Sequence, residues 1–471
     1  MANSVFEDKK FQEVLTERYK FVQDIYLNDD RPWVIGYSGG KDSTVITDLI
    51  LTSISMLPKE KRHKPIFIIS SDTMVENPMI ESYIEENIEK IQNYCEQKKL
   101  PITANLIKPE TKDSFWVNLI GKGYPAPQQK FRWCTDRLKI KPANIFVKNK
   151  VDVYGEVVMV LGVRSSESLS RSIIMEKHKI EGKVLRKHTS LANALVFAPI
   201  EDFSTDDVWK YLMTKNPNAW NEDNEFLMSL YQDSQDGECP LMVDKETPSC
   251  GNSRFGCWAC TVVQEDKSLN GFIKTAKKNK DKETLKKLIP LTDLRNWLKD
   301  HRNDEEYREQ KRQNGTLYRV QTKEGSKVGL GAYNFNGRKI ILKKLLEVQI
   351  ESGLNLVSVE ELKYIQDEWN KRLGDLSNGV NKIYNEVYGY NIFNDKQAMI
   401  YSESELNLLD DLCKEENISP EILRRLLKVE QKHYGYMFKN GLYTEIDSIL
   451  NEEWIHEDEI KDLKFGDTND N

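Results

Sequence analysis

The sequence predicts an α/β fold, in which a parallel sheet carries helices on both faces and a mainly helical C-terminal region follows. Three observations lead to this prediction. Apolar runs of strand length alternate with helical patterns through the first part of the chain, a glycine-rich turn at 36–44 joins a strand candidate to a helix candidate, and the periodicity is mostly helical from about residue 265 onward. Such alternation is typical of βαβ units, because parallel strands need crossover connections.

The individual elements follow from apolar runs and capping signals. Runs rich in aliphatic residues predict strands at 33–38, 65–70, 102–107 and 157–163. Helical spacing predicts helices at 43–56, 77–98 and 136–149. Farther along, Ser204 precedes a helix with a capping-box pattern, and Ser419-Pro420 opens another helix.

The length of 471 residues allows two or three domains. We place one boundary near residue 265, which gives a nucleotide-binding domain over 1–265 and a mainly helical region over 266–471. The formal net charge of −7 hides an asymmetry, because basic residues outnumber acidic ones in 264–345 and acidic residues outnumber basic ones in 346–471. The middle of the chain is therefore a candidate for contact with an anionic partner.

Composition indicates a soluble protein, with 39% hydrophobic and 30% charged residues. No apolar run approaches the length of a membrane span, and the first residues lack the basic start and apolar middle of a signal peptide. We therefore expect a cytoplasmic protein that makes no membrane contact. In a reducing compartment, the seven cysteines point to metal or redox chemistry rather than to disulfides.

The glycine-rich turn is the most informative motif of the chain. It reads Ser38-Gly39-Gly40-Lys41-Asp42-Ser43, after a strand candidate and before a helix candidate. Glycines let the backbone approach a phosphate, and free N–H groups at a helix N-terminus favour negative charge. The motif is not a Walker A loop, since position 35 is Ile and Asp42 follows the lysine. It resembles the PP-loop of ATP pyrophosphatases, which implies that it binds ATP; the alternative is a glycine turn without a ligand.

Four cysteines gather within a short segment that also contains glycines and aromatic residues. They are Cys239, Cys250, Cys257 and Cys260, of which the last two form a C-x-x-C pair. Four thiolates suit either a tetrahedral zinc ion or a [4Fe–4S] cluster, and the spacing does not separate the two. The alternative is a set of buried, inert thiols.

A fifth cysteine, Cys134, stands among the basic residues Arg132, Arg137 and Lys139. Neighbouring cations favour thiolate, so we expect a lowered pKa. This residue could act as a nucleophile, carry persulfide sulfur or ligate a cluster, and the alternative is a packed cysteine at a helix start.

Several motifs together resemble one family. They are Ser38 to Ser43, Arg132-Trp133-Cys134-Thr135, Gly162-Val163-Arg164 with Glu167-Ser168 and Arg171, and Pro199-Ile200-Glu201-Asp202 before Trp209. Over roughly residues 20–265 the chain resembles the phosphoadenylyl-sulfate reductase family. The segment Cys250–Cys260 and the long helical C-terminal part look like one branch of that family, the DNA phosphorothioation sulfurtransferases of the DndC type. This resemblance implies a [4Fe–4S] cluster, hydrolysis of ATP to AMP and pyrophosphate, and replacement of a non-bridging phosphate oxygen of DNA by sulfur.

The resemblance also suggests roles for individual residues. Lys41 and the loop amides would stabilise charge on the pyrophosphate, Mg²⁺ would bridge the phosphates, and Asp42 could organise metal or water. After the second strand come Asp72, Thr73 and Glu76, at the edge of the sheet where the nucleotide would bind, although helix capping by Asp72–Glu76 is an equal alternative. Arg164 and Arg171 are candidates for phosphate contacts, the alternative being solvated arginines.

Sulfur would reach the protein as a persulfide from a cysteine desulfurase, with Cys134 as the preferred acceptor. Other DNA phosphorothioation subunits are implied as partners. Two basic groups are candidates for DNA contact, although solvated helix faces explain them equally well. They are Lys274, Lys277, Lys278, Lys286, Lys287, Arg295 and Arg302, and then Arg338, Lys339, Lys343 and Lys344.

Three other functions stay open. The first is a sulfonucleotide reductase, against which stands the lack of any cysteine after Cys413, because reductases of this family use a C-terminal catalytic cysteine. The second is tRNA thiolation, which shares the loop and the cluster chemistry. The third is a scaffold without turnover that binds nucleotide and holds a cluster or zinc.

Overall fold

In the computed structural model the chain divides into two compact units, each described by itself here: Met1–Glu110 with Pro127–Leu288, and Thr111–Ala126 with Ile289–Asn471. The described residues are 4–166, 173, 176–178, 180, 183–232, 256–311, 318–322, 325–393, 403–416, 418–434 and 441–451. The boundary predicted near residue 265 does not coincide with the division between these units. The first unit extends beyond it, and a short segment from the first half of the chain belongs to the second unit.

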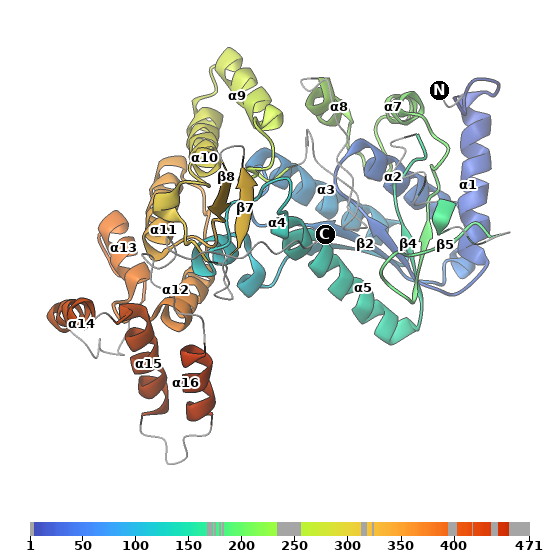
Figure 1. The fold of residues 1–471 in the computed structure, drawn as a ribbon. Coiled ribbons are helices and arrows are strands. Elements are labelled where there is room, and N and C mark those ends of the chain that lie inside the picture. The colour runs from blue at the N-terminus through green and yellow to red at the C-terminus, as the bar shows by residue number, and fades with distance from the viewer. Residues whose placement is uncertain are drawn as a thin grey trace. The chain divides into compact units, whose positions relative to one another are not determined.

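A six-stranded sheet forms the centre of the first unit (Figure 1). In spatial order its strands are β3 (Ile102–Ile107), β2 (Ile66–Ser71), β1 (Trp33–Gly36), β4 (Val157–Val160), β6 (Ala194–Phe197) and β5 (Arg186–Lys187). Neighbours from β3 to β6 pair in parallel and β5 pairs antiparallel to β6. The four predicted strands are confirmed, and the sequence analysis missed β5 and β6.

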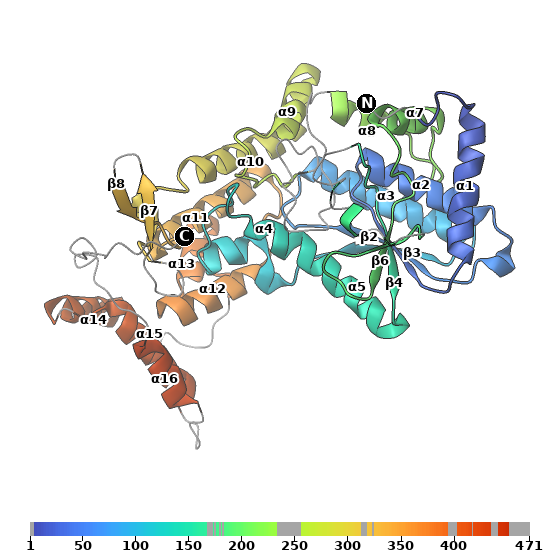
Figure 2. The same cartoon turned by 45° about the vertical axis from the view of Figure 1, so that its right-hand side comes forward.

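The helices of this unit cover both faces of the sheet, as Figure 2 shows with α1 to α3 on one side and α5 on the other. The longer helices are α1 (Phe11–Leu27), α2 (Lys41–Ser55), α3 (Pro78–Gln97), α5 (Lys141–Tyr154), α7 (Thr205–Thr214), α8 (Glu225–Gln232) and α9 (Lys267–Asn279). Shorter turns are η1 (Lys59–Lys61), α4 (Trp133–Thr135) and η4 (Asp136–Ile140). The predicted α/β class with a parallel sheet is therefore confirmed.

Alternate residues of each strand explain the two layers, because successive side chains of a strand point to opposite faces. Trp33 and Ile35 of β1 pack in the core that also includes residues of α1, α2, α3, α7 and α8. Val34, between them, packs in a second core with Val147 of α5 and Phe67 of β2. Strands buried on both faces read as continuous apolar runs, which is why the sequence pattern revealed them.

The second unit is mainly helical, as the sequence predicted. Its elements are η2 (Thr111–Asp113), η3 (Val117–Gly121), η5 (Glu305–Tyr307), the hairpin β7 (Arg319–Thr322) and β8 (Gly325–Val328), α11 (Phe335–Ser352), α12 (Val359–Leu373), α13 (Gly379–Tyr388), α14 (Glu403–Glu415), α15 (Pro420–His433) and α16 (Leu442–Leu450). The division between units falls within α10 (Lys282–Asp300). Two side chains of the later helices anchor the segment Thr111–Ala126 of this unit. Arg338 donates to Gly121 O at 2.8 Å, and Trp369 donates to Ile120 O at 2.9 Å.

The capping signals give mixed outcomes. Ser204 and Asp207 form the predicted capping box at the start of α7. Ser419 is the N-cap residue of α15 and Pro420 lies in its first turn, but the Ser419 side chain makes no capping hydrogen bond. The helix start is therefore confirmed there without the expected side-chain bond.

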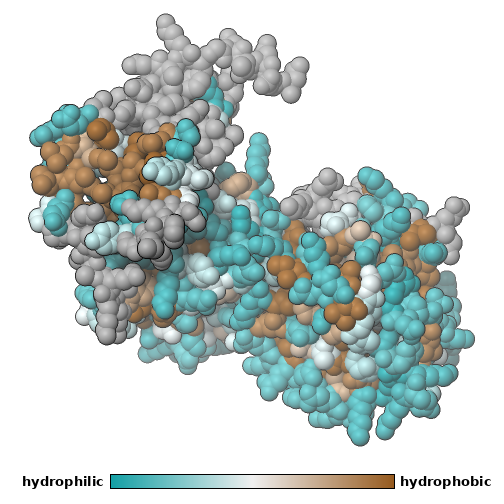
Figure 3. Space-filling view, turned by 90° about the horizontal axis from the view of Figure 1, so that it is seen from below, coloured by the Kyte–Doolittle hydropathy of each residue, from teal (hydrophilic) through white to brown (hydrophobic). Residues whose placement is uncertain are grey.

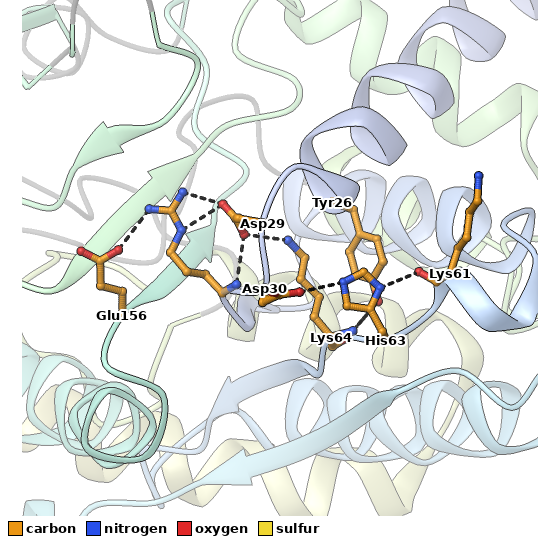
Figure 4. A network of polar contacts seen from close by, with 8 residues as sticks. Tyr26, Asp29, Asp30, Lys61, His63, Lys64 and Glu156 are labelled. Atoms are coloured by element: carbon orange, nitrogen blue, oxygen red, sulfur yellow. Dashed lines mark hydrogen bonds and ion pairs between the residues drawn. The ribbon is translucent and has the colours of Figure 1, made fainter.

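A charged network closes the amino edge of the sheet, just before β1, β2 and β4 (Figure 4). Asp29 accepts from Arg31 Nε at 2.9 Å and from Lys64 Nζ at 3.1 Å, and Arg31 Nη1 reaches Glu156 at 3.2 Å. Lys64 is buried against the rings of Tyr26 and Trp33. Burial alone would raise the pKa of Asp29, but its two cations lower that pKa overall. These groups satisfy one another at the amino edge, whereas the glycine turn after β1 lies at the opposite, carboxyl edge.

No helix among the described residues is long and apolar enough to cross a membrane. On the face shown in Figure 3, hydrophilic residues predominate over most of the surface, and apolar residues gather on part of it.

Candidate nucleotide and thiol site

The glycine turn lies at the carboxyl end of β1 and leads directly into α2. Gly39 has a φ of +72°, and a Cβ added there would lie 3.1 Å from Ile84 Cγ1, so this position requires glycine. Gly40 is the N-cap residue, and without a side chain it makes no side-chain capping bond to the first-turn amides of α2. Helix amides and the positive end of the helix dipole then face an incoming anion, which is the geometry of a phosphate cradle.

The two serines of the motif brace the turn. Ser38 Oγ lies 3.1 Å from Ser43 Oγ, and Ser43 Oγ donates to Gly40 O at 2.9 Å. The Ser38 amide also donates to Ser43 Oγ at 3.2 Å. These contacts fix the backbone of the turn, and the predicted contacts of both serines with nucleotide stay predictions.

Asp42 joins two buried cations. Lys41 Nζ lies 2.8 Å from Asp42 Oδ2, and Arg164 Nε donates to Asp42 Oδ1 at 2.6 Å. The Lys41 side chain is 2% exposed and that of Arg164 is 0% exposed. Arg164 follows β4 and also donates to Ser166 and Thr205. The structure therefore shows Arg164 beside the PP-loop, in contact with Asp42, and the phosphate contact predicted for it stays a prediction.

Tyr231 is a residue of this site that the sequence analysis missed. Its hydroxyl accepts from the Lys41 amide at 3.3 Å, and Lys41 Nζ lies 5.4 Å from the centre of its ring. Tyr231 belongs to α8 and is separated from Lys41 by 190 positions, so no local sequence pattern could have connected the two.

The loop after β2 carries the next set of predicted residues. Asp72 is buried, accepts from the Met74 amide at 2.7 Å and pairs with Lys108 at 2.8 Å. The N-cap of α3 is Asn77, whose side chain accepts from the Met79 amide. The alternative that Asp72–Glu76 supplies the cap of this helix is therefore wrong. A nucleotide contact of Asp72 stays a prediction.

The same loop reaches the C-x-x-C segment. Thr73 Oγ1 lies 3.2 Å from Cys257 Sγ and donates to Glu76 Oε1 at 2.9 Å. Glu76 forms an antiparallel bridge with Cys257, and the Trp258 amide donates to Val75 O at 2.9 Å. Two backbone segments far apart in sequence are thus held in a short sheet-like register.

Cys134 lies with the C-x-x-C pair, at the start of the helical turns that precede α5. Burial, together with the negative charge of Cys260, raises the pKa of Cys134 to about 12 although Lys139 opposes both. Burial likewise raises the pKa of Cys257, and Cys134 is among the charges that add to this shift. The expectation of a lowered pKa at Cys134 is therefore wrong, because desolvation outweighs the cation that the sequence places nearby.

Three of the five candidate thiols thus gather in one place, while Cys239 and Cys250 lie outside the described residues, as does Arg171. Thiolates are the ligands that zinc and iron–sulfur clusters prefer, so the donor set fits such a centre in kind. Within the described ranges, no three His, Cys, Asp or Glu side chains form a complete metal-binding group. The predicted ligand set Cys239, Cys250, Cys257 and Cys260 stays a prediction.

Comparison with known proteins agrees with the family-level prediction. Residues 32–263 match the model of the phosphoadenosine phosphosulfate reductase domain. This segment contains the PP-loop, Cys134, Arg164 and the C-x-x-C pair, so every described part of the candidate site lies within it. The match supports a reductase-like PP-loop domain in the first half of the chain, and it does not extend to the DndC branch.

An uncharacterized protein of Methanocaldococcus jannaschii is 24% identical over 193 residues, which is 41% of this chain and 34% of that protein. The chain therefore spans about a third of the curated relative that it matches.

Solved structures give weaker likenesses. The NH3-dependent NAD synthetase of Campylobacter jejuni has a TM-score of 0.29 at 13% identity, covering 63% of this chain and 97% of that one. The U34-tRNA thiolase of Methanococcus maripaludis, solved with its [4Fe–4S] cluster, has a TM-score of 0.28 at 16% identity, covering 62% and 81%. The FMN adenylyltransferase of Candida glabrata has a TM-score of 0.27 at 15% identity, covering 45% and 60%. TM-scores this low carry no conclusion about this chain.

Proposed function

We propose that this chain is the ATP-dependent sulfurtransferase of a DNA phosphorothioation system, of the DndC type. One observation carries the proposal: the phosphate cradle and the thiol group stand on adjacent strand ends. The PP-loop follows β1, the loop that contacts Cys257 follows β2, and these two strands pair in parallel. Parallel strands end at the same edge, so a nucleotide and a sulfur atom can meet there.

The first step is adenylyl transfer. A non-bridging oxygen of a DNA phosphodiester attacks the α-phosphorus of ATP, the bond from that phosphorus to the β-phosphate oxygen breaks, and pyrophosphate leaves. Lys41 and the first-turn amides of α2 stabilise the charge that develops on pyrophosphate. Mg²⁺ would neutralise the phosphates, with Asp42 and Asp72 as candidate ligands for such an ion.

The second step delivers sulfur. A cysteine desulfurase supplies persulfide sulfur to Cys134, and the terminal sulfur attacks the adenylated phosphorus as AMP leaves. A thiol of an external dithiol reductant then attacks the inner sulfur, which leaves a phosphorothioate on DNA and a mixed disulfide on Cys134. The second thiol of that reductant displaces Cys134, which returns as a free thiol while the reductant leaves as a disulfide. The metal centre would be held by Cys239, Cys250, Cys257 and Cys260. A [4Fe–4S] cluster at this place would bind sulfur and set its reduction potential.

The proposal of DNA as partner is supported by a lysine-rich surface on α9 and the start of α10. Its exposed members, which we call the α9 lysine surface, are Lys267, Lys274, Lys277, Lys278, Lys280, Lys282 and Lys286. The acidic residues in and beside this stretch make local contacts, since Asp266 caps α9, Asp281 accepts from the Thr284 amide at 3.1 Å and Glu283 pairs with Lys287 at 2.9 Å. On its other face α9 stacks Phe272 on Phe226 of α8, the helix that carries Tyr231. The surface therefore belongs to a helix that packs beside the cradle.

Two measurements test the reaction. Chromatography of products from wild-type protein should show AMP and pyrophosphate, and the Lys41→Ala variant should lose both; release of ADP and phosphate instead would contradict adenylyl transfer.

Mass spectrometry of nuclease-digested DNA from cells carrying Cys134→Ser should show no sulfur-bearing dinucleotides, whereas the control Cys95→Ser, which changes a buried thiol of α3, should retain them. Sulfur found in tRNA rather than in DNA would favour the thiolase alternative.

A third measurement tests the partner. Reversing the charge of Lys274, Lys277 and Lys278 should flatten the dependence of log K on log salt by about 3, since each phosphate contact contributes about 0.9 to the slope. A matched triple reversal at Lys59, Lys98 and Lys99, which are exposed near the amino edge of the sheet, should leave the slope unchanged. Equal slopes in both triple variants would exclude the α9 lysine surface as the DNA contact.

A further inference from the structure

Backbone pairing between the loop after β2 and the C-x-x-C segment holds Thr73 next to Cys257. The bridge between Glu76 and Cys257 and the bond from the Trp258 amide to Val75 O fix the two segments on either side of the contact. Thr73 is 0% exposed and Glu76 is 7% exposed, so water does not compete for their polar atoms. The distance of 3.2 Å between Thr73 Oγ1 and Cys257 Sγ therefore belongs to a built site.

Proton counting gives the contact a direction. A threonine hydroxyl has one proton to donate and two lone pairs that accept. While Cys257 carries its own proton, the thiol can donate to Thr73 Oγ1 and the hydroxyl donates to Glu76 Oε1 at 2.9 Å. When a metal ion displaces the thiol proton, the Cys257 sulfur can only accept a hydrogen bond. The Thr73 hydroxyl is then the group that can donate to it. When the hydroxyl donates to the sulfur, the Glu76 carboxylate still has a cationic neighbour, because Lys139 Nζ lies 3.8 Å from Glu76 Oε1.

We propose that Thr73 is a positioning residue for the thiol centre, with a hydroxyl that donates to the Cys257 sulfur when that sulfur is metal-bound. Glu76 accepts from the hydroxyl in the metal-free state and gives up that hydrogen bond when the sulfur becomes metal-bound. The inference rests on the proposed metal centre and gives Thr73 a role toward the thiols, whereas the sequence analysis placed it only at the nucleotide edge, since Thr73 lies 184 positions from Cys257. Hydrogen bonds from outside the ligand set orient the ligands, and losing one typically costs 10–100-fold in metal affinity.

Three threonine variants test the inference in the full-length, reduced and metal-free chain. Thr73→Val removes the hydroxyl at nearly constant volume, and Thr73→Ser restores it. Thr47→Val is the matched control, because Thr47 is equally buried on α2 and its hydroxyl has no hydrogen-bond partner among the described residues. Anaerobic titration with Co²⁺, followed through thiolate-to-cobalt charge-transfer absorption, reports affinity without ATP, DNA or turnover.

We expect Thr73→Val to bind Co²⁺ about 10–100-fold more weakly, whereas Thr73→Ser and Thr47→Val stay close to wild type. Equal affinity of Thr73→Val and wild type would overturn the inference. Wild-type protein that binds Co²⁺ through thiolates but releases no pyrophosphate contradicts the proposed reaction and leaves the result on Thr73 standing.

A second readout decides the case in which wild-type protein shows no thiolate-to-cobalt absorption, which would contradict the proposed metal centre itself. Peptide mass spectrometry then follows the alkylation of Cys257 by iodoacetamide, with Cys260 of the same molecule as the reference. Loss of the donor should slow the alkylation of Cys257 in Thr73→Val and not in Thr73→Ser. An unchanged ratio of the two rates in Thr73→Val would refute a positioning role.

Discussion

Replacing Arg164 with methionine should weaken ATP binding through a change in local charge. Asp42 lies between Lys41 and Arg164, at 2.8 Å and 2.6 Å, so these three groups together carry one positive charge. Without Arg164, Asp42 pairs one to one with Lys41, and the net charge of the group falls to zero. A triphosphate is a polyanion, so the cradle loses attraction for it although no loop amide has changed.

The magnitude follows from Coulomb's law. For a phosphate charge about 6 Å from the lost guanidinium, an effective dielectric constant of about 20 gives roughly 3 kcal/mol. Because each 1.4 kcal/mol is about tenfold in affinity, and solvent near the phosphates screens part of the interaction, we expect Arg164→Met to bind about 10–100-fold more weakly. Arg164 itself is fully buried, so the screening at its end is small.

Isothermal titration with a non-hydrolysable ATP analogue, in the absence of Mg²⁺, measures this effect. The double variant Arg164→Met with Asp42→Asn restores one net positive charge over these three positions, since a neutral amide then replaces the Asp42 carboxylate. Its affinity should return close to that of wild type, and Asp42→Asn alone should bind more tightly than wild type. A double variant as weak as Arg164→Met would refute the reasoning from charge.

The matched control is Arg186→Met. Arg186 also pairs with a carboxylate, Glu201 at 2.6 Å, and its side chain is 11% exposed. It belongs to β5, the strand at the edge of the sheet, three strands from β1 in the sheet order. Nucleotide affinity should be unchanged in this variant, and thermal melting of all variants separates lost binding from lost folding.

Three further predictions concern stability. Gly162→Ala should destabilise the chain by about 1–3 kcal/mol in urea unfolding, since the added Cβ would lie 3.0 Å from the carbonyl carbon of Asp42; an unchanged midpoint would mean that the turn can shift freely. Burial and nearby carboxylates raise the pKa of Glu81 to about 7, so the stability of wild type relative to Glu81→Gln should fall as the pH rises from 4.5 through 7; parallel profiles would contradict this. The lowered pKa of Asp29 has the opposite sign: Asp29→Asn should be destabilised at pH 7, and the difference should shrink as the pH falls below 3.8, which acid titration monitored by circular dichroism would show.

The central strands β1, β2 and β4 were predictable because they are continuous apolar runs buried on both faces. The strand β3 includes Thr103 and Asn105 and is mostly half-buried, so its apolar signal is weaker. The observed bounds of all four predicted strands differ from the predicted ones by a few positions at most. The two missed strands lack that signal. Residues Arg186–Lys187 form a strand of only two polar positions, and Ala194–Phe197 is short, with its middle residues half-buried.

The site was predictable only where it is local. The PP-loop is a contiguous motif whose turn and helix start follow from its own residues, and the structure places it as expected. Tyr231 at Lys41 and Thr73 at Cys257 are contacts across 190 and 184 positions. Such pairs depend on the packing of α8 and on the loop after β2, neither of which leaves a periodic trace in the sequence.

Cys134 shows why neighbours in sequence were an insufficient guide to chemistry. Its basic neighbours are visible in the sequence, but its burial and its approach to Cys260 are tertiary facts that act in the opposite direction on the pKa. A half-buried thiol with a pKa of about 12 reacts slowly as a free nucleophile near neutral pH. Persulfide transfer to Cys134 therefore needs a change in its surroundings, through bound metal at the neighbouring thiols or through docking of the sulfur donor. The proposed reaction thus predicts that the desulfurase modifies Cys134 only in the metal-loaded or partner-bound protein, and efficient transfer to the isolated metal-free chain would argue against burial as the control.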